Sequence, residues 1–300
     1  GYIDQDRDFG ENIWSTPLEQ FAAVHDEQIE QYSQELRLSG GSNDIRWIAG
    51  AFFWHDTFDS DNTGNSADIL GLLAGVNPVE WTVDQETDAY AAYGSVDWDF
   101  AERWMLTVGL RYSYEETDFE GGTDGTIIDS AAFDEFVGAP LEIPNGTTIP
   151  FTFLDDSVDD DRLDYRVALE FRPTDDILTY GSVTSGFKSG GWNARGTAPG
   201  AFLPFGPEEI WSYELGLRAD WADGRVRTNV TLFYSDLSDL QTTSATPDGQ
   251  FLTTNAGGIQ NPGLEFELTA LPTDNWELFF GLGLQDAEYV DLPEGCEVPN

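Results

Sequence analysis

Few side chains in this sequence carry the usual chemistry of catalysis or metal binding. His25 and His55 are its two histidines, the first in an expected loop and the second near the end of an expected strand. A histidine acts as a base or a metal ligand together with partners, and the spacing around these two supplies none. We therefore interpret both as rim residues and predict no catalytic residue, no metal site, no cofactor and no enzyme activity.

Clustered carboxylates are a second candidate for chemistry. The run Asp155, Asp156, Asp159, Asp160 and Asp161 could bind Ca²⁺, because hard cations prefer carboxylate oxygens. The run lacks the fixed order of acidic residues found in an EF-hand loop. We therefore interpret it as a solvated loop whose charges repel one another.

Aromatic and basic residues gather where an expected strand enters a long loop. Phe187, Lys188, Trp192 and Arg195 lie within nine positions of one another. Aromatic faces beside cations suit an anionic, ring-bearing ligand such as a siderophore. Lys188, Trp192 and Arg195 are therefore the candidate ligand-binding residues, although a structural role for this cluster is the competing interpretation.

Composition limits the class of protein that must position these residues. The chain has 13 basic and 56 acidic residues, a formal charge of −43, and Lys188 as its one lysine. Such a surface excludes nucleic acid as a partner, because phosphates require Lys and Arg. Aromatic residues nevertheless make up 14% of the chain while its mean hydropathy is negative. This combination is typical of a barrel with a wet interior and a lipid-facing exterior.

Apolar and polar residues alternate with a period of two in many segments. In one of them the apolar positions are Leu163, Tyr165, Val167, Leu169 and Phe171. A period of two indicates strands, because a helix would scatter these positions around its axis. The segments pair into five hairpins, with a possible eleventh strand over 1–9: 27–38 with 44–58, 86–99 with 103–118, 161–172 with 176–187, 209–221 with 225–236, and 261–271 with 275–290.

Short and long connections alternate along the chain. Tight links rich in Gly, Pro, Asn and Asp join the strands of each hairpin. Long links join successive hairpins, at about 59–85, 119–160, 188–208 and 237–260. A membrane barrel has this pattern, because its turns are short at one rim and long at the other. The predicted fold is therefore all-β, an antiparallel transmembrane β-barrel with strands of roughly eleven to sixteen residues.

The aromatic spacing fits this fold. Trp104 and Tyr114 share one strand face ten residues apart, as do Trp211 and Trp221. Ten tilted strand residues climb about 25 Å, the height of the apolar band between two aromatic girdles. Alternation then places apolar residues such as Val167 toward lipid. It places the intervening residues in the lumen, among them Ala168, Arg111, Arg166, Glu170, Arg218, Glu265 and Glu267.

Both ends of the chain suggest a piece of a longer protein. No signal peptide begins at Gly1, and no run of about eighteen apolar residues could form a transmembrane helix. The last residues, 294–300, have the composition of a loop. Within them Cys296 is either an unpaired loop thiol or half of a disulfide whose partner lies beyond Asn300.

Several ordered segments resemble one family. The stretch Ser185–Asn193 is similar to the Gly-Phe-Lys-Ser-Gly-Gly-aromatic-Asn segment of TonB-dependent receptors. The other segments that fit the family, in the register of the hairpins, are Ser33–Leu38, Thr107–Tyr112, Pro207–Leu217, Asn229–Asp236, Asp239–Gln241, Thr254–Gly257 and Gly263–Glu267.

This resemblance implies a partial TonB-dependent receptor-type β-barrel domain over residues 1–300. Receptors of this family are 22-stranded barrels with a plugged lumen, so ten or eleven strands make about half of one. The plug and the TonB box precede the barrel in the family and are not recognisable here. The resemblance also implies a place in the bacterial outer membrane, contact with its lipid and coupling to the TonB complex.

Three functions remain open from the sequence. The resemblance implies TonB-dependent active uptake of a scarce ligand, with a ferric siderophore as the family's most frequent substrate. A passive outer-membrane porin would need neither plug nor TonB. A soluble secreted β-sheet binding protein would bury its apolar strand faces in a core instead of exposing them to lipid.

Overall fold

The computed structural model describes residues 1–12, 21–66, 75–193, 202–245 and 251–292. Most of them form one 12-stranded sheet in the order β1-β2-β3-β4-β5-β6-β7-β10-β11-β14-β15, with β16 added beside β14. Its strands are antiparallel throughout, which confirms the predicted all-β antiparallel fold. They are β1 (Tyr2–Asn12), β2 (Phe21–Gly41), β3 (Ile45–Ser66), β4 (Val76–Ala101), β5 (Trp104–Ile127), β6 (Thr148–Thr174), β7 (Ile177–Lys188), β10 (Glu208–Trp221), β11 (Val226–Ser238), β14 (Gly258–Thr273), β15 (Trp276–Gln285) and β16 (Glu288–Val290).

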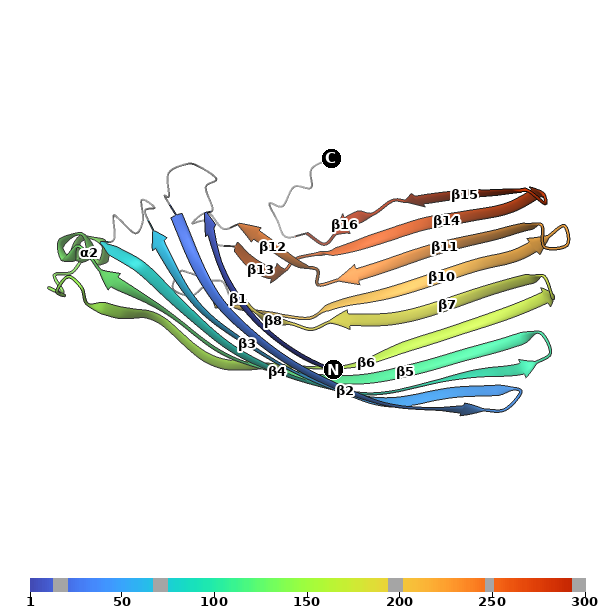
Figure 1. Cartoon of the computed structure of the whole chain (residues 1–300), viewed down its shortest axis with the longest axis horizontal. Coiled ribbons are helices and arrows are strands. Elements are labelled where there is room, and N and C mark those ends of the chain that lie inside the picture. The colour runs from blue at the N-terminus through green and yellow to red at the C-terminus, as the bar shows by residue number, and fades with distance from the viewer. Residues whose placement is uncertain (13–20, 67–74, 194–201, 246–250, 293–300) are drawn as a thin grey trace.

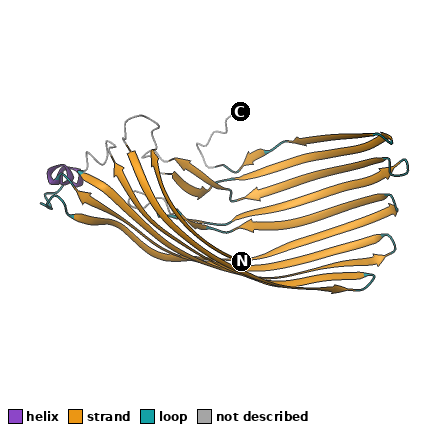
Figure 2. Ribbon diagram, viewed as in Figure 1, coloured by secondary structure: helices purple, strands orange, loops and turns teal. Residues whose placement is uncertain are grey.

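Smaller elements accompany this curved sheet. Strand β8 (Gly191–Trp192) pairs with β9 (Pro204–Phe205), and β12 (Gln241–Ala245) pairs with β13 (Phe251–Asn255). In Figure 1, β8, β12 and β13 lie on the concave side of the sheet. Helix α2 (Ser130–Val137) lies at the far end of the long strands (Figure 2). Within the described ranges, we find no helix of a length and apolarity that would let it cross a membrane.

The hairpins have the pairing expected from the sequence. Each of the five predicted pairs is joined by a short link, and these links are residues 42–44, 102–103, 175–176, 222–225 and 274–275. The segment expected as an eleventh strand is β1, which pairs with β2 from Tyr2↔Tyr32 to Asn12↔Ala22. Pattern and turn chemistry were therefore sufficient to predict the five hairpins.

Strand length in the first half of the sheet differs from the prediction. Strands β2 to β6 have 21 to 27 residues, whereas β7, β10, β11, β14 and β15 have 10 to 16. Much of the expected loops 59–85 and 119–160 is therefore strand. The long strands extend well beyond the ends of the short ones (Figure 1). Outside lipid the convex face meets water and carries polar residues while the concave face is buried, so the sequence loses the outward apolar face that indicates a membrane strand.

The acidic run between Asp155 and Asp161 shows this error directly. It lies inside β6 and not in a loop. Strand geometry alternates the carboxylates between the two faces, so Asp155, Asp159 and Asp161 lie on the face opposite to Asp156 and Asp160. The prediction of a solvated loop was wrong, and the alternation separates the oxygens that a Ca²⁺ site would require together.

The two faces of the sheet differ in chemistry as predicted. One cross-strand row of the convex face is Trp47, Val96, Val108, Val167, Val183 and Tyr213. The neighbouring row of the concave face is Ile48, Ser95, Gly109, Arg166, Thr184 and Ser212. Val167 is 45% exposed and Ala168 is 8% exposed. An apolar face turned outward fits lipid contact, and it does not fit the core of a soluble sandwich.

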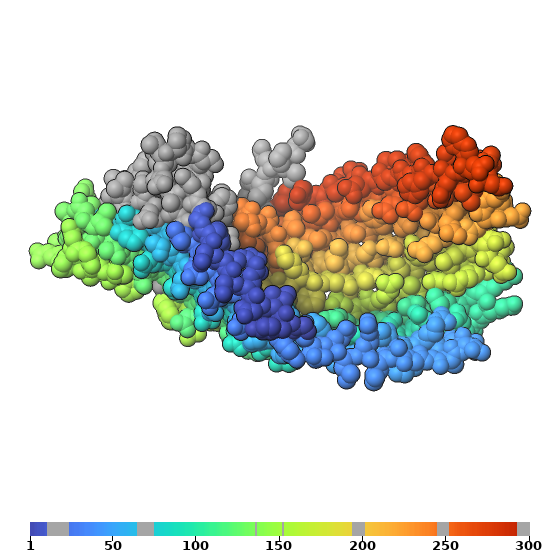
Figure 3. All heavy atoms as spheres, viewed as in Figure 1, coloured from blue at the N-terminus to red at the C-terminus, as the bar shows by residue number. Residues whose placement is uncertain are grey.

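Aromatic rings mark the two ends of this apolar band. Near the short turns, Trp104 stacks on Phe171 with ring centroids 4.3 Å apart. Toward the other end, Phe53 contacts Tyr90 at 5.1 Å, and Tyr165 stacks on Trp211 at 6.3 Å. These pairs bound the membrane-spanning part of the sheet, which in β5 runs from Trp104 to Tyr114. In the space-filling view the strands of the second half form a continuous wall (Figure 3).

Candidate ligand-binding wall

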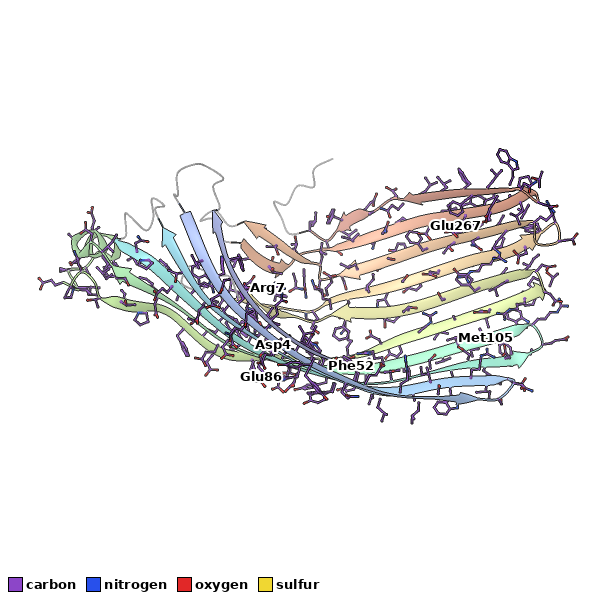
Figure 4. All side chains as sticks on the ribbon, viewed as in Figure 1. Asp4, Arg7, Phe52, Glu86, Met105 and Glu267 are labelled. Carbon is purple, nitrogen blue, oxygen red and sulfur yellow. The ribbon has the colours of Figure 1, made fainter. Side chains whose placement is uncertain are left out.

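A hollow of about 500 Å³ lies on the concave face at the upper end of the membrane-spanning strands. Phe52 and Trp54 line it from β3, and Arg111 and Glu115 line it from β5. Alternation brings these side chains to one face, because each pair is two residues apart on its strand. Figure 4 shows Phe52 in the curved middle of the sheet. The hollow is also lined by Ala89, Tyr90, Ser113, Tyr114, Asp164, Gly186, Phe187 and Ser189.

Arg111 supplies the positive charge of the hollow. Its guanidinium carbon lies 5.8 Å from the centroid of the Phe52 ring, and its Nε donates to Ser113 Oγ at 3.0 Å. A guanidinium over an aromatic face leaves donors that can bind a carboxylate, phenolate or similar oxygen. In a chain with a net charge of −43, this cation is a specific point of attraction for an anionic ring system.

Two carboxylates hold the segment that follows β7. Glu115 and Asp160 are directly opposite each other on β5 and β6, and the Gly190 N–H donates to Asp160 Oδ2 at 2.9 Å. Burial raises the pKa of Glu115, a hydrogen bond with Ser189 lowers it, and the charge of Asp160 raises it. The chain therefore folds back over the concave face at Ser189 and Gly190.

The three predicted ligand residues are distributed differently. Lys188 is exposed at the end of β7. Trp192 is 7% exposed and stacks on Phe119 with ring centroids 5.2 Å apart, in a buried cluster with Val83 and Phe202. Arg195 lies outside the described residues. The structure thus gives Trp192 an anchoring position, and the ligand role of all three stays a prediction.

Asn193, the last residue of the Gly-Phe-Lys-Ser-Gly-Gly-Trp-Asn stretch, fastens this segment to its surroundings. Its side-chain amide donates to the carbonyls of Leu203 and Thr253 at 2.8 and 2.9 Å. Its Oδ1 accepts from the Thr253 N–H at 2.6 Å. Asn255 acts similarly, since its Oδ1 accepts from the Gly206 N–H at 2.6 Å and its Nδ2 lies 2.8 Å from the Asp239 carbonyl. These asparagines hold the loops in position.

The histidines lie in two different surroundings. His25 belongs to β2 and is 3% exposed, so the prediction of a loop residue was wrong. His55 lies on the convex face of β3, with its Nδ1 3.0 Å from Asp88 Oδ1 and 3.9 Å from Glu86 Oε1. The ligand atoms of His55, Glu86 and Asp88 lie within 4.8 Å of one another. The residues are 31 and 33 positions apart along the chain, so the sequence spacing could not show this group.

A second hollow of about 500 Å³ lies on the concave face near the short turns. Its walls are charged, with Arg218 5.5 Å from the Tyr180 ring centroid, Arg227 Nε donating to Asp220 at 2.7 Å, and Asn229 donating to Glu267 at 3.0 Å. Arg218, Glu265 and Glu267 therefore face the concave side as predicted. The sequence identified the face of Arg111 as well, whereas it did not identify Phe52, Trp54 or Glu115 as its neighbours.

Comparison with known families agrees with this architecture. The family described as "TonB dependent receptor-like, beta-barrel" matches residues 1–295. The pesticin receptor of Yersinia enterocolitica is 27% identical over 215 residues, which are 71% of this chain and 28% of that protein. The ferric-pyoverdine M114 receptor PbuA of Pseudomonas sp. is 25% identical over 277 residues, 87% of this chain and 29% of that protein. The chain thus spans less than a third of these relatives.

Solved structures show the same fold. The ferric yersiniabactin uptake receptor FyuA of Yersinia pestis superposes with a TM-score of 0.72 at 20% identity, covering 96% of this chain and 39% of that one. The copper transporter OprC superposes with a TM-score of 0.66 at 15% identity, covering 96% and 42%. The family match over nearly the whole chain and the outward apolar face of the sheet both indicate a membrane β-barrel. The chain belongs to the TonB-dependent receptor β-barrel family, a non-enzymatic family of the outer membrane.

Proposed function

We propose that the receptor containing this chain actively imports a ferric siderophore across the outer membrane in a TonB-dependent manner. Residues 1–300 form one part of its barrel domain. In this proposal the membrane lipid contacts the convex face, and a plug occupies the concave side. The TonB complex acts through a plug and a TonB box supplied by the rest of the receptor.

The hollow lined by Phe52, Trp54 and Arg111 carries the proposal. A siderophore chelate is a compact group of oxygen ligands, usually anionic and often with aromatic rings. Arg111 offers a charged, planar set of donors for such oxygens, and the two rings offer apolar faces. The volume of about 500 Å³ lies within the range of small-molecule sites. Lys188 and Arg195 are proposed to add positive charge to the ligand site, and Trp192 is proposed to anchor the segment that follows β7.

The relatives add support for iron as the cargo. One is named a ferric-pyoverdine receptor, and two of the similar folds are a ferric yersiniabactin receptor and a ferric-catecholate import receptor. The copper transporter has the same fold and carries a different metal. The guanidinium of Arg111 beside the rings of Phe52 and Trp54 suits an organic chelate, because such a ligand can use both the donors and the apolar faces.

Uptake of radioactive iron by intact cells tests this function. Cells carrying the full-length receptor would be supplied with ⁵⁵Fe bound to pyoverdine, to yersiniabactin or to a catecholate siderophore. We expect one of these chelates to enter, and entry to stop when TonB is deleted or the proton gradient is dissipated. Arg111→Gln should weaken binding of that chelate about tenfold. Arg166→Gln, on the same face nearer the short turns, is the matched control and should change binding little.

Three other outcomes would contradict this proposal. Uptake that continues without TonB would favour a passive porin. Failure of all three chelates to bind, in a receptor that is folded in the membrane, would remove the siderophore assignment. Equal binding by the Arg111 and Arg166 variants would show that the hollow at Phe52 is not the binding site.

A further inference from the structure

The lipid-facing side of the sheet has a hollow of its own, at the outer edge of the membrane band. Its volume is about 460 Å³ and its exposed surface is almost entirely apolar. Ala51 on β3 and Ala92 on β4 lie directly opposite each other at its floor. The hollow is also lined by Gln34, Leu36, Phe52, Phe53, Tyr90, Ala91, Tyr112 and Tyr114. Two small side chains among larger ones thus leave a depression in the convex face.

Three side chains that can bind a metal follow on the same two strands, directly outward from this hollow. His55 on β3 is opposite Asp88 on β4, and Glu86 is two residues further out. All three share the convex face with Ala51, since the positions alternate by two. Figure 4 labels Glu86 nearer the outer ends of the strands than Phe52. His55 is four residues from Ala51, about 13 Å of strand, and therefore lies just above the membrane band.

The geometry of these side chains suits a divalent cation. His55 Nδ1 lies 3.0 Å from Asp88 Oδ1 and 3.9 Å from Glu86 Oε1, and the three ligand atoms are within 4.8 Å of one another. Zn²⁺ holds such ligands at about 2.0–2.2 Å, so they stand roughly 3.3 Å apart around it. The side chains are 32–54% exposed, so a cation can reach them. Three protein ligands leave the fourth position of Zn²⁺ open for an outside oxygen.

The surrounding surface explains why a cation is needed at this level. Glu116 is opposite Asp88 and Asp118 is opposite Glu86, so carboxylates continue across β5. Residues 54–66, 76–90 and 114–127 contain no lysine and no arginine. The phosphate of a lipid headgroup would therefore meet only negative charge here and be repelled. A cation held between the phosphate and the carboxylates turns this repulsion into attraction.

We propose that His55, Glu86 and Asp88 hold a divalent cation such as Zn²⁺, which binds the headgroup phosphate of an outer-leaflet lipid. One acyl chain of the same lipid lies in the hollow over Ala51 and Ala92. The occupant is a lipid because the hollow belongs to the face that already contacts the bilayer, and because one lipid molecule reaches from the headgroup level into the membrane band. This inference goes beyond the proposed import function and does not depend on the imported ligand.

The experiment uses the full-length receptor in nanodiscs of digalactosyl diacylglycerol, a bilayer lipid without phosphate. The probes are Zn²⁺ and two lipids with the same nitroxide-labelled chains, phosphatidic acid and diacylglycerol. Electron paramagnetic resonance measures the fraction of each label that the protein immobilises. We expect Zn²⁺ to raise this fraction for phosphatidic acid, EDTA to reverse the rise, and diacylglycerol to show no change. Inorganic phosphate should not displace the labelled lipid, because it has no chain for the hollow.

Two variants test the cation ligands. His55→Gln and Asp88→Asn each remove one ligand, so the affinity for Zn²⁺ measured by calorimetry should fall at least about tenfold. The effect of Zn²⁺ on phosphatidic acid should disappear with it. Asp61→Asn is the matched control, because this carboxylate lies on the same face of β3, six residues further out than His55. It should leave both measurements unchanged. Heat-modifiable migration on a denaturing gel shows that each variant is folded.

A third variant tests the hollow separately from the cation. Ala51→Phe fills the floor, so it should keep the affinity for Zn²⁺ and reduce the Zn²⁺-dependent immobilisation of phosphatidic acid. Ala270→Phe is its control, on the lipid face of β14 near the short turns. This variant should immobilise the lipid as the wild type does.

Other results would overturn the proposal. If both ligand variants bind Zn²⁺ as the wild type does, His55 and its carboxylates are an ordinary surface ion pair. If Zn²⁺ acts equally on diacylglycerol, or if inorganic phosphate displaces phosphatidic acid, the cation does not hold a lipid headgroup. If Ala51→Phe immobilises phosphatidic acid as the wild type does, the hollow is not the site of the chain. None of these measurements involves uptake, so the import function and this proposal can fail independently.

Discussion

Two glycines explain part of the family pattern at the level of single residues. Gly216 lies in the Tyr-Glu-Leu-Gly stretch of β10, and a Cβ atom there would collide with the ring of Tyr180 on β7. Gly263 on β14 lies in the same way against the ring of Phe233 on β11. Each glycine lets an aromatic ring lie flat on the neighbouring strand of the concave wall. The guanidinium of Arg218 in turn lies over the ring of Tyr180. The glycine at 216 thus helps to position the charged side chain of Arg218, through the ring of Tyr180.

Adjacent residues on β11 should tolerate arginine very differently. Leu232 is 52% exposed on the convex face in the middle of the strand, and Thr231 is on the concave face opposite Glu265. Leu232→Arg should cost about 2–4 kcal/mol, because lipid offers no water or counter-charge. Thr231→Arg meets a carboxylate and should cost less than about 1 kcal/mol. Urea titrations of the full-length receptor in bilayers measure both. Equal losses would contradict the assignment of the two faces.

The hydrogen bonds of Asn193 should hold the outer loops in a fixed conformation. Asn193→Asp keeps the size of the side chain, removes two donated hydrogen bonds and places a negative oxygen against two carbonyls. The local free energy of opening should fall by about 2–4 kcal/mol. Limited proteolysis of intact cells should then cut between residues 189 and 207 faster than in the wild type. Asn275→Asp, in an exposed turn at the opposite end, is the control. An unchanged cleavage rate would mean that the Asn193 bonds do not hold this segment.

At the scale of the strands, the sequence was informative where the membrane imposes a rule. Between Trp104 and Tyr114 every second residue faces lipid, and the alternation predicted strand, face and partner correctly. Beyond this band the convex face meets water and is polar, as at Asp118 and Glu120 on β5, while the concave face is buried, so the strand continues without the membrane pattern. The burial of His25 could not be predicted, because it depends on Asn62 and Trp81 of other strands. Contacts between distant segments therefore set the part of the site that could not be predicted.

The acidic upper part of β3 should respond to pH. Burial and the nearby carboxylates of Asp84, Asp61 and Glu30 raise the pKa of Asp59 above its ordinary value. The folded state then binds the proton more tightly than the unfolded state, so ionisation of Asp59 lowers stability as pH rises through the interval between the ordinary and the raised pKa. Asp59→Asn should therefore slow amide hydrogen exchange in residues 57–64 at pH 7.

Below about pH 3 the carboxyl group is mostly protonated in both states, and the same variant should have little effect there. Asp223→Asn, in an exposed turn, controls for a general change in net charge and should leave exchange in β3 unchanged at both pH values. Faster exchange in Asp59→Asn at pH 7 would contradict the sign of this argument.

The whole sheet ends in two strands that each have one unpaired side. In the described strand order, β1 and β15 are the edges, and they have 11 and 10 residues. Unpaired backbone groups are costly in lipid and promote association in water. Expressed alone, the 300-residue span should aggregate and should not migrate as a compact, heat-modifiable barrel on a denaturing gel, whereas the full-length receptor should. A soluble monomer of the span with cooperative unfolding would contradict its place in a membrane barrel.

The unequal lengths of the strands give the described part of the barrel wall a slanted outer edge. Strands β2 to β6 exceed their later counterparts by about ten residues, which at a tilt near 40° is a difference in height of roughly 25 Å. A molecule that diffuses parallel to the membrane surface meets a low edge on one side of the sheet and a high edge on the other. The outer edge of the described sheet is therefore high along β2 to β6 and low along the later strands. The rate of ligand capture should therefore depend on the direction of approach. Neighbouring molecules that crowd the low side should slow capture more than those behind the high side.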